Sequence, residues 1–227
     1  MILGMVCARK GSQGIPGKNL LELGGLTLLE RAIAKCIVSD LIDVVSVSTD
    51  IDTRDLTDKL ANCDKPIIWQ NRPSHLAGPD ISKWPVFQQI TMNAESVFEG
   101  CECCADVDVS RPLTTATDLD NTIKAFLTTE APALLACSRA KKNPYQDTYL
   151  MQDFRLRPAL TGGKAARQDQ PPAYEHGGLF VVDRNALFAV DDMWELEVDS
   201  YEIERAHTFD VDDPLDWVIA QAVHEYA

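Results

Sequence analysis

Three glycines and three cations lie together in a short stretch near the start of the chain. The segment reads Val6-Cys7-Ala8-Arg9-Lys10-Gly11-Ser12-Gln13-Gly14-Ile15-Pro16-Gly17-Lys18-Asn19-Leu20. Glycines let backbone amides approach an anion closely, and Arg9 and Lys18 add positive charge beside those amides. We therefore predict that the loop binds the phosphates of a nucleoside triphosphate, with the amides of Gly11 and Ser12 as fixed donors.

The spacing of the loop differs from two common phosphate-binding fingerprints. No Gly-Lys pair in the chain is followed by Ser or Thr, as a Walker A loop requires. The glycines are spaced G-x-x-G-x-x-G, so the G-x-G of a dinucleotide-binding loop is also missing from it. A solvated surface loop with ordinary turn glycines is the alternative that spacing alone leaves open.

A pair of carboxylates near the carboxyl terminus forms a second candidate site. Asp210 and Asp212 are separated by Val211, and in a strand residues two apart point to the same face. Magnesium is usually held by one or two carboxylates together with phosphate oxygens and water. The pair could therefore hold a metal, although capping of a helix by Asp212 or Asp213 before Pro214 is the structural alternative.

Composition and charge limit the classes of partner. The chain has 227 residues, 45% of them hydrophobic and 25% charged, which fits one large globular domain. A net charge of −14 argues against nucleic-acid binding, which usually needs a basic face, and it makes the basic loop stand out. No apolar run reaches transmembrane length and the first residues do not form a secretory leader, so we expect no membrane partner.

The cysteines predict a reducing environment. Seven cysteines, an odd number, indicate reduced thiols and a cytoplasmic location. Cys101, Cys103 and Cys104 form the only dense cluster in the sequence. A zinc site would need a second pair of ligands at metal spacing, so we interpret these three as buried thiols beside a strand.

Apolar runs alternate with helical patterns along most of the chain, as in a parallel sheet built from βαβ units. Strands are predicted at 1–8, 44–48, 66–69, 105–109, 131–137 and 177–183, and helices at 27–39, 53–62, 82–98, 117–128 and 215–226. Thr27 and Glu30 have the spacing of a capping box for the first helix. The predicted fold class is therefore α/β, a doubly wound, Rossmann-like and mostly parallel sheet. The glycine-rich loop then lies where open sheets bind ligands.

One region breaks this alternation. Residues 139–176 are rich in Pro, Lys, Arg, Gln and Tyr, with only a weak strand at 148–152. We interpret this stretch as an arm inserted into a single domain that spans 1–227.

The basic loop resembles the signature loop of the acylneuraminate cytidylyltransferases, also called CMP-sialic acid synthetases. The shared pattern is Ala8-Arg9-x-Gly11-Ser12-x-Gly14-Ile15-Pro16-x-Lys18-Asn19. These enzymes join a nine-carbon 2-keto sugar acid to CMP, using CTP and magnesium. The resemblance implies that Ala8, Arg9, Gly11, Ser12, Lys18 and Asn19 bind the nucleotide, and that Arg9 and Lys18 also act in catalysis.

Further motifs resemble the same family in the same order. Ser48-Thr49-Asp50 matches the end of its second strand, and Arg72-Pro73-x-x-Leu76-Ala77-x-x-Asp80 matches a segment whose arginine reads the pyrimidine base. Asp210-Val211-Asp212 matches the family's metal-binding D-x-D, which implies Mg²⁺ as cofactor. The arm at 139–176 corresponds to one that lies between the two subunits of a dimer, which implies a homodimer.

The sugar-binding half departs from the family pattern. The part of the family pattern that surrounds the sugar site corresponds here to Arg167-Gln168-Asp169, Tyr174 and His176. We expect Arg167 to pair with the sugar carboxylate, because arginine forms bidentate pairs with carboxylates. Asp108 replaces a glutamine that contacts the sugar, which would disfavour an anionic group there. The expected substrates are CTP and an anionic sugar acid of the sialic, legionaminic, pseudaminic or Kdn type.

Three alternatives are open at this point. An enzyme acting on the eight-carbon sugar Kdo would usually have a different loop, and Asn19 argues against it. A nucleotide-binding protein that has lost catalysis is consistent with the altered sugar half. A haloacid-dehalogenase-type phosphatase is suggested by Asp106-Val107-Asp108-Val109-Ser110, although that motif normally opens the chain.

Overall fold

A seven-stranded sheet forms the centre of the protein. The computed structural model describes residues 1–164 and 166–226, with the side chain of Arg167 also left undescribed. The strands are ordered β11-β7-β10-β6-β1-β4-β5. Their bounds are β1 Ile2–Ala8, β4 Val44–Thr49, β5 Ile67–Asn71, β6 Cys103–Val107, β7 Ala133–Arg139, β10 Tyr174–Asp183 and β11 Val198–Glu202. Only β10 runs antiparallel to its neighbours, so the predicted α/β fold with a mostly parallel sheet is confirmed.

The middle strands are buried on both faces. Every residue of β1, β4 and β6 is buried, which explains why β1 is a continuous apolar run and why small or apolar residues predominate in the other two strands. The loops that follow the carboxyl ends of these strands are therefore attached to a rigid support.

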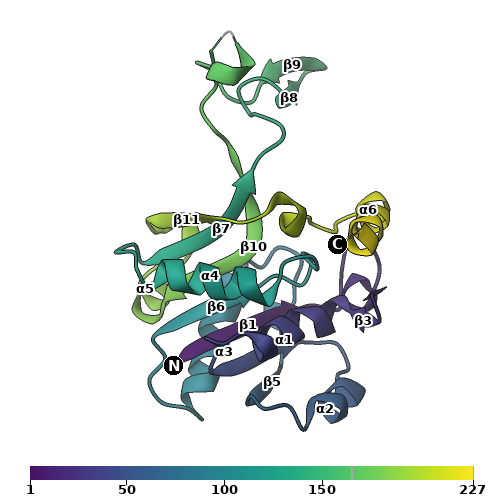
Figure 1. Ribbon diagram of the computed structural model, residues 1–227, viewed down its shortest axis with the longest axis vertical. Coiled ribbons are helices and arrows are strands. Elements are labelled where there is room, and N and C mark those ends of the chain that lie inside the picture. The colour runs from purple at the N-terminus through teal and green to yellow at the C-terminus, as the bar shows by residue number, and fades with distance from the viewer. Residues whose placement is uncertain (165, 227) are drawn as a thin grey trace.

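Helices cover both faces of the sheet (Figure 1). On one face, α1 (Leu28–Val38) and α4 (Ala116–Phe126) pack their apolar sides into one core cluster, which α6 (Pro214–Tyr226) extends. On the other face, α3 (Trp84–Glu95) and α5 (Arg184–Ala189) fill a second cluster. The predicted capping box of α1 is present, and Thr115 with Asp118 forms another at the start of α4.

The remaining elements are short. They are α2 (Arg54–Leu60), the hairpin of β2 (Glu22–Leu23) and β3 (Leu26–Thr27), and the 3₁₀ turns η1 (Lys18–Leu20), η2 (Ser74–Leu76), η3 (Arg167–Asp169), η4 (Met193–Glu195) and η5 (Arg205–Thr208). The hairpin, α5 and β11 are additions to the elements predicted from the sequence. Among the helices described, none combines the length and apolarity needed to cross a bilayer.

An arm projects from the sheet between β7 and β10 (Figure 1). The chain leaves the sheet after Arg139 and returns at Tyr174, which is its cross-strand partner. Within the arm, β8 (Tyr149–Gln152) pairs with β9 (Arg155–Pro158) in an antiparallel hairpin. The hairpin turn places Asp153 and Phe154 at positive φ, 50° and 61°, as a two-residue type I′ turn requires.

Candidate nucleotide-binding site

A cavity of about 510 Å³ opens beyond the carboxyl ends of β1, β5 and β6. This is the edge at which an open α/β sheet binds ligands. The cavity brings together many of the residues predicted from the sequence, namely Arg9, Ser12, Lys18, Asn19, Arg72, Asp108 and Asp212. Residues from both ends of the chain therefore meet in one place.

Lys18 joins the glycine-rich loop to the acidic segment. Its Nζ lies 2.6 Å from the carbonyl oxygen of Val211 and 3.0 Å from Oδ1 of Asp212. The Lys18 side chain is only 14% exposed, whereas that of Asp212 is 73% exposed, so the carboxylate remains accessible to a ligand. A nucleotide that enters the cavity meets a cation already held in position.

Gly14 explains how the loop and the acidic segment come so close. A Cβ atom built on Gly14 would lie 1.9 Å from the backbone oxygen of Asp212, far inside van der Waals contact. The approach of the two backbones therefore requires glycine at this position.

Arg9 follows β1 and Arg72 follows β5, and each donates a hydrogen bond to a backbone oxygen. Arg9 donates from Nη1 to the carbonyl oxygen of Gly78 at 3.0 Å. Arg72 is 8% exposed, and it donates from Nη2 to the carbonyl oxygen of Ser48 at 3.1 Å. Since a guanidinium has five N–H groups, Arg72 keeps donors for a ligand. Buried Asn19 instead donates its amide to the carbonyl oxygen of Arg9 at 2.9 Å, so it supports the loop.

The backbone of the loop differs from expectation at one predicted donor. The amide of Ser12 donates to the carbonyl oxygen of Lys10 at 3.1 Å, so it is used within the loop. Gly11 has open space around its Cα, and Ala8 is buried in β1. The amide of Lys10 donates to Oδ1 of Asp50 at 2.6 Å, which fixes the loop to the end of β4.

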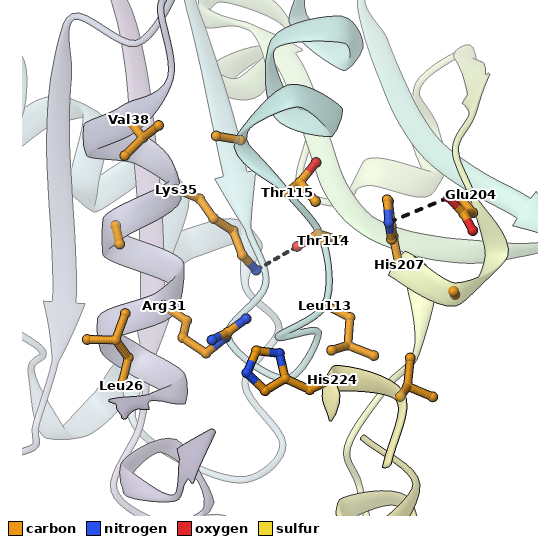
Figure 2. Close-up of a pocket in the computed structure, with 14 residues that line it drawn as sticks. Leu26, Arg31, Lys35, Val38, Leu113, Thr114, Thr115, Glu204, His207 and His224 are labelled. Atoms are coloured by element: carbon orange, nitrogen blue, oxygen red, sulfur yellow. Dashed lines mark hydrogen bonds and ion pairs between the residues drawn. The ribbon is translucent and has the colours of Figure 1, made fainter. Parts of the chain in front are cut away.

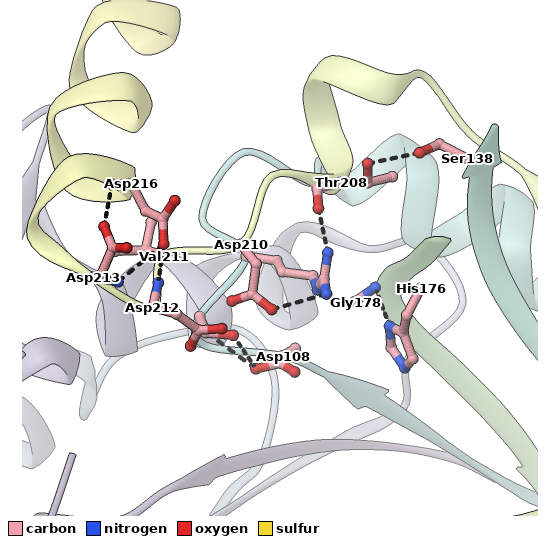
Figure 3. Close-up of polar contacts among 12 residues, drawn as sticks. Asp108, Ser138, His176, Gly178, Thr208, Asp210, Val211, Asp212, Asp213 and Asp216 are labelled. Atoms are coloured by element: carbon pink, nitrogen blue, oxygen red, sulfur yellow. Dashed lines mark hydrogen bonds and ion pairs between the residues drawn. The ribbon is translucent and has the colours of Figure 1, made fainter. Parts of the chain in front are cut away.

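The acidic segment is an extended connection after η5 and not the strand that the sequence analysis assumed. Asp210 lies outside the cavity wall, and its Oδ2 is 2.8 Å from Nη2 of Arg111 (Figure 3). Burial raises the pKa of Asp210 and Arg111 opposes that rise, while the negative charges of Asp108 and Asp212 add to it. Three carboxylates therefore lie close enough to repel one another.

The first turn of α6 shows which aspartate caps this helix. Asp213 accepts hydrogen bonds from the amides of Leu215 at 2.7 Å and Asp216 at 3.0 Å (Figure 3). Asp213 is thus the cap, and the carboxylate of Asp212 is left to pair with Lys18. Within the described residues, no three His, Cys, Asp or Glu side chains are grouped so that they could hold a metal ion by themselves.

Lys83 is a site residue that the sequence analysis missed. Its Nζ lies 2.9 Å from Oδ2 of Asp106 and 3.2 Å from Oδ2 of Asp108. Burial raises the pKa of Asp106 to about 6, and Lys83 opposes this rise. For Asp108, burial acts in the same direction, but Lys83 and the Ser110 amide hold its pKa below the usual value. The negative charge of Asp108 is therefore partly balanced, which weakens the repulsion expected for an anionic substrate.

A second cavity of about 200 Å³ adjoins the first through Ser82, Lys83 and Asp108. It is lined by aromatic side chains and by His176. Burial and then the nearby Arg111 lower the pKa of His176 to about 4, so the ring is neutral near pH 7. Its Nδ1 accepts a hydrogen bond from the amide of Gly178 at 2.7 Å. Tyr174 lines a further cavity beside His176.

The other residues predicted to bind sugar lie on the arm. Gln168 is exposed in η3, and it is not among the residues that line the nucleotide cavity or the cavity with Asp108 and His176. The side chain of Arg167 lies outside the described part of the structure.

A further cavity, of about 690 Å³, is lined by residues of α1, the loop that follows β6, η5 and α6 (Figure 2). Lys35 on α1 donates to the carbonyl oxygen of Arg111 at 3.0 Å and to Oγ1 of Thr114 at 2.6 Å. Arg31, one turn earlier, donates to the carbonyl oxygen of Pro112 at 3.3 Å. Burial and then Arg31 lower the pKa of Lys35 to about 7. These α1 cations brace the loop that carries Asp108 and Arg111.

Comparisons with known proteins agree with this geometry. Residues 3–61, which include the glycine-rich loop, match the family model described as Cytidylyltransferase. The post-translational flagellin modification protein B of Campylobacter coli is 26% identical over 223 residues, 97% of this chain and 93% of that protein. CMP-N,N'-diacetyllegionaminic acid synthase of Campylobacter jejuni is 25% identical over 225 residues, 97% of this chain and 93% of that protein.

A solved structure extends the comparison to the fold. The complex of CMP:2-keto-3-deoxy-manno-octonic acid synthetase with CTP superposes with a TM-score of 0.69 at 14% identity, covering 99% of this chain and 98% of that one. The sequence matches are to a cytidylyltransferase model and to a CMP-sugar acid synthase, so they argue against the phosphatase alternative. The chain thus matches the cytidylyltransferase family over residues 3–61 and is similar over almost its whole length to a synthase of a CMP-linked sugar acid, in agreement with the prediction from its glycine-rich loop.

Proposed function

We propose that the protein transfers CMP from CTP to a hydroxyl group of a nonulosonic, sialic-acid-like 2-keto sugar acid, with release of pyrophosphate. The observation that carries the proposal is the meeting of Lys18, Arg9, Arg72 and Asp212 in one cavity at the carboxyl edge of the sheet. Two relatives that match almost the whole chain support it, one of them named as a synthase of a CMP-linked sugar acid.

The reaction is an in-line displacement at the α-phosphorus of CTP. A bond forms between the sugar oxygen and phosphorus, the bond from phosphorus to the bridging oxygen breaks, and pyrophosphate leaves with the electron pair. Such transfers depend on positioning and charge stabilisation more than on covalent chemistry. Lys18 and Arg9 are placed to neutralise the triphosphate, and Lys18 exchanges its contact with Asp212 for one with phosphate oxygens.

The chain has a donor set that fits a divalent cation. Asp212 presents an exposed carboxylate to the cavity, and the buried Oδ1 atom of half-buried Asp210 has no hydrogen-bond partner among the described residues. Hard carboxylate oxygens suit Mg²⁺, which completes its shell with water and substrate phosphates. We propose that Asp210 and Asp212 hold Mg²⁺, whose chemistry there would be to offset charge on the reacting phosphate.

Arg72 is proposed to read the cytosine base. It lies in the cavity wall, buried, with its direction fixed by Ser48. Cytosine offers the acceptors O2 and N3, which match the spare N–H groups of a fixed guanidinium. The acceptor sugar would then occupy the adjoining cavity, against Asp108, Lys83 and His176.

The arm is proposed to complete the acceptor site of a second copy in a homodimer. Its hairpin exposes several apolar side chains, Tyr149, Leu150, Met151, Phe154 and Leu156, as expected for a surface that another chain covers. In that dimer, Arg167 would bind the sugar carboxylate and Gln168 a neighbouring group.

The cysteines bear on the location of the protein. None of the seven cysteines is in a disulfide, which supports a cytoplasmic, reducing location.

The test is an acceptor screen with the full chain, CTP and Mg²⁺. A panel of nine-carbon 2-keto sugar acids is incubated with the protein, and the product is identified by its mass while pyrophosphate is measured. We expect a CMP-sugar and pyrophosphate only when an acceptor is present. Binding of CTP without any product across the panel would instead favour the alternative of a nucleotide-binding protein without catalysis.

A further inference from the structure

Two cysteines far from the nucleotide cavity lie in sulfur–sulfur contact. Cys101 and Cys104 are separated by two residues at the start of β6, and their Sγ atoms are 3.7 Å apart. The cavity lies beyond the other, carboxyl end of the same strand. This pair is therefore independent of the transfer reaction.

We propose that Cys101 and Cys104 form a reversible thiol–disulfide exchange site, which a small-molecule disulfide such as oxidised glutathione converts to an intramolecular disulfide. The intervening Cys103 does not take part, because it points into the α1/α4 core cluster while Cys104 points into the α3/α5 cluster.

Formation of this disulfide needs only a small movement of the two sulfur atoms. A disulfide bond is about 2.05 Å long, so the two sulfurs must approach by about 1.7 Å. Cys104 is fixed in β6, with its Sγ 3.2 Å from Oγ1 of Thr91. Cys101 lies in the connection before β6, after Gly100 at a φ of +74° with open space around it, so the shift falls on the less constrained partner.

The two thiols differ in the way that the exchange reaction requires. Cys101 is partly exposed, whereas Cys104 is 0% exposed. A hydrogen bond from Cys104 lowers the pKa of Cys101, and the same interaction together with burial raises the pKa of Cys104. Cys101 is thus the attacking thiolate and Cys104 the resolving thiol.

The electrons and atoms balance in two exchange steps. The Cys101 thiolate attacks one sulfur of oxidised glutathione, so the S–S bond breaks and one glutathione leaves as a thiolate. Cys104 then attacks the sulfur of Cys101 in the mixed disulfide, and the second glutathione leaves. The two protein thiols are oxidised, one glutathione disulfide is reduced to two glutathiones, and the protons of Cys101 and Cys104 pass to them.

The test treats the native full chain with oxidised glutathione, then denatures it, alkylates every remaining thiol in the denatured state and identifies the products by mass spectrometry. We expect two of the seven thiols to lose their alkylation, with no glutathione retained at Cys101 and full reversal by dithiothreitol. The Cys101→Ser variant must lose the crosslink, whereas Cys103→Ala, its matched control, must keep it. A Cys63→Ser variant removes the other partly exposed thiol and must also keep the crosslink.

Two results would overturn the proposal. One is alkylation of all seven thiols after treatment. The other is a stable glutathione adduct at Cys101, because an adduct that Cys104 does not resolve means that the two sulfurs cannot meet. Neither result depends on CTP, so the outcome is separate from that of the acceptor screen.

Discussion

Replacing Gly14 by alanine tests the contact that joins the two ends of the chain. The new Cβ would lie 1.9 Å from the backbone oxygen of Asp212, while ordinary van der Waals contact begins at 3.4 Å. The loop and the acidic segment must therefore separate by about 1.5 Å, since neither contact atom is a flexible side-chain end. This displacement moves Lys18 relative to Asp212 directly.

Two magnitudes follow from that displacement. Overpacking of this kind costs about 1–3 kcal/mol, and one kcal/mol shifts the melting temperature of a domain of this size by about 2–4 °C. We therefore expect Gly14→Ala to melt about 2–12 °C below the wild type. Misplacement of catalytic groups by about 1 Å costs on the order of 100-fold, so kcat/KM for CMP transfer should fall by about that factor.

The measurements are thermal unfolding of the nucleotide-free protein and pyrophosphate release at fixed acceptor concentration. Gly11→Ala is the matched stability control from the same loop, because its Cβ would meet no atom within 4 Å. We expect Gly11→Ala to melt like the wild type in the absence of nucleotide. If Gly14→Ala also melts like the wild type and transfers CMP at the wild-type rate, the close approach of Gly14 to Asp212 is refuted.

Three further changes test the site and its support. Lys18→Met should lower kcat/KM by about 10²–10³ without loss of fold, because one preorganised cation is removed; an unchanged rate would remove Lys18 from the mechanism. Asp212→Asn should raise the Mg²⁺ concentration for half-maximal activity by about tenfold or more, so an identical metal titration would contradict the metal assignment. The pKa of Lys35 is lowered to about 7 by burial and Arg31, so the unfolded chain binds more protons above that pH. Stability contributed by this group therefore increases from pH 7 toward 10, and the difference in melting temperature between wild type and Lys35→Met should increase over that range; a constant difference would show that Lys35 is not perturbed.

The sequence carried enough information to predict the central strands and the first helix. Strands β1, β4 and β6 are buried on both faces, and the apolar and β-branched residues in them identify them as strands. The capping box at Thr27 is a local signal between residues three apart, and the structure has it. Local and strongly apolar features are therefore the predictable part of this fold.

The edge strand β11 shows the opposite case. Its residues, Val198 to Glu202, are mostly polar, and no position is fully buried. The strand exists because β7 offers unpaired backbone groups along its edge, and this partner lies far away in the sequence. Neither periodicity nor composition within the segment could indicate that pairing.

The candidate site residues divide in the same way, into those that belong to local sequence motifs and those that depend on contacts between distant segments. Arg9, Lys18 and Arg72 belong to short motifs, and they were identifiable without a structure. Lys83 lies between two strand-end aspartates only because α3 begins beside β6, and Arg111 pairs with an aspartate about a hundred residues later. These ion pairs depend on tertiary placement, so no pattern within the sequence could indicate them.

The attachment of the arm has a consequence for how the protein can change over evolutionary time. Because Arg139 and Tyr174 are cross-strand partners, the body of the enzyme meets the arm as it would meet a hairpin loop. Doubling the length of such a connection costs only about 0.6 kcal/mol in closure entropy, so the arm can be lengthened, shortened or exchanged while the sheet is unaffected. With the arm in its proposed role at the acceptor site, a lineage could acquire a new acceptor by altering this appendage alone, while the cavity at the carboxyl edge of the sheet stays unchanged.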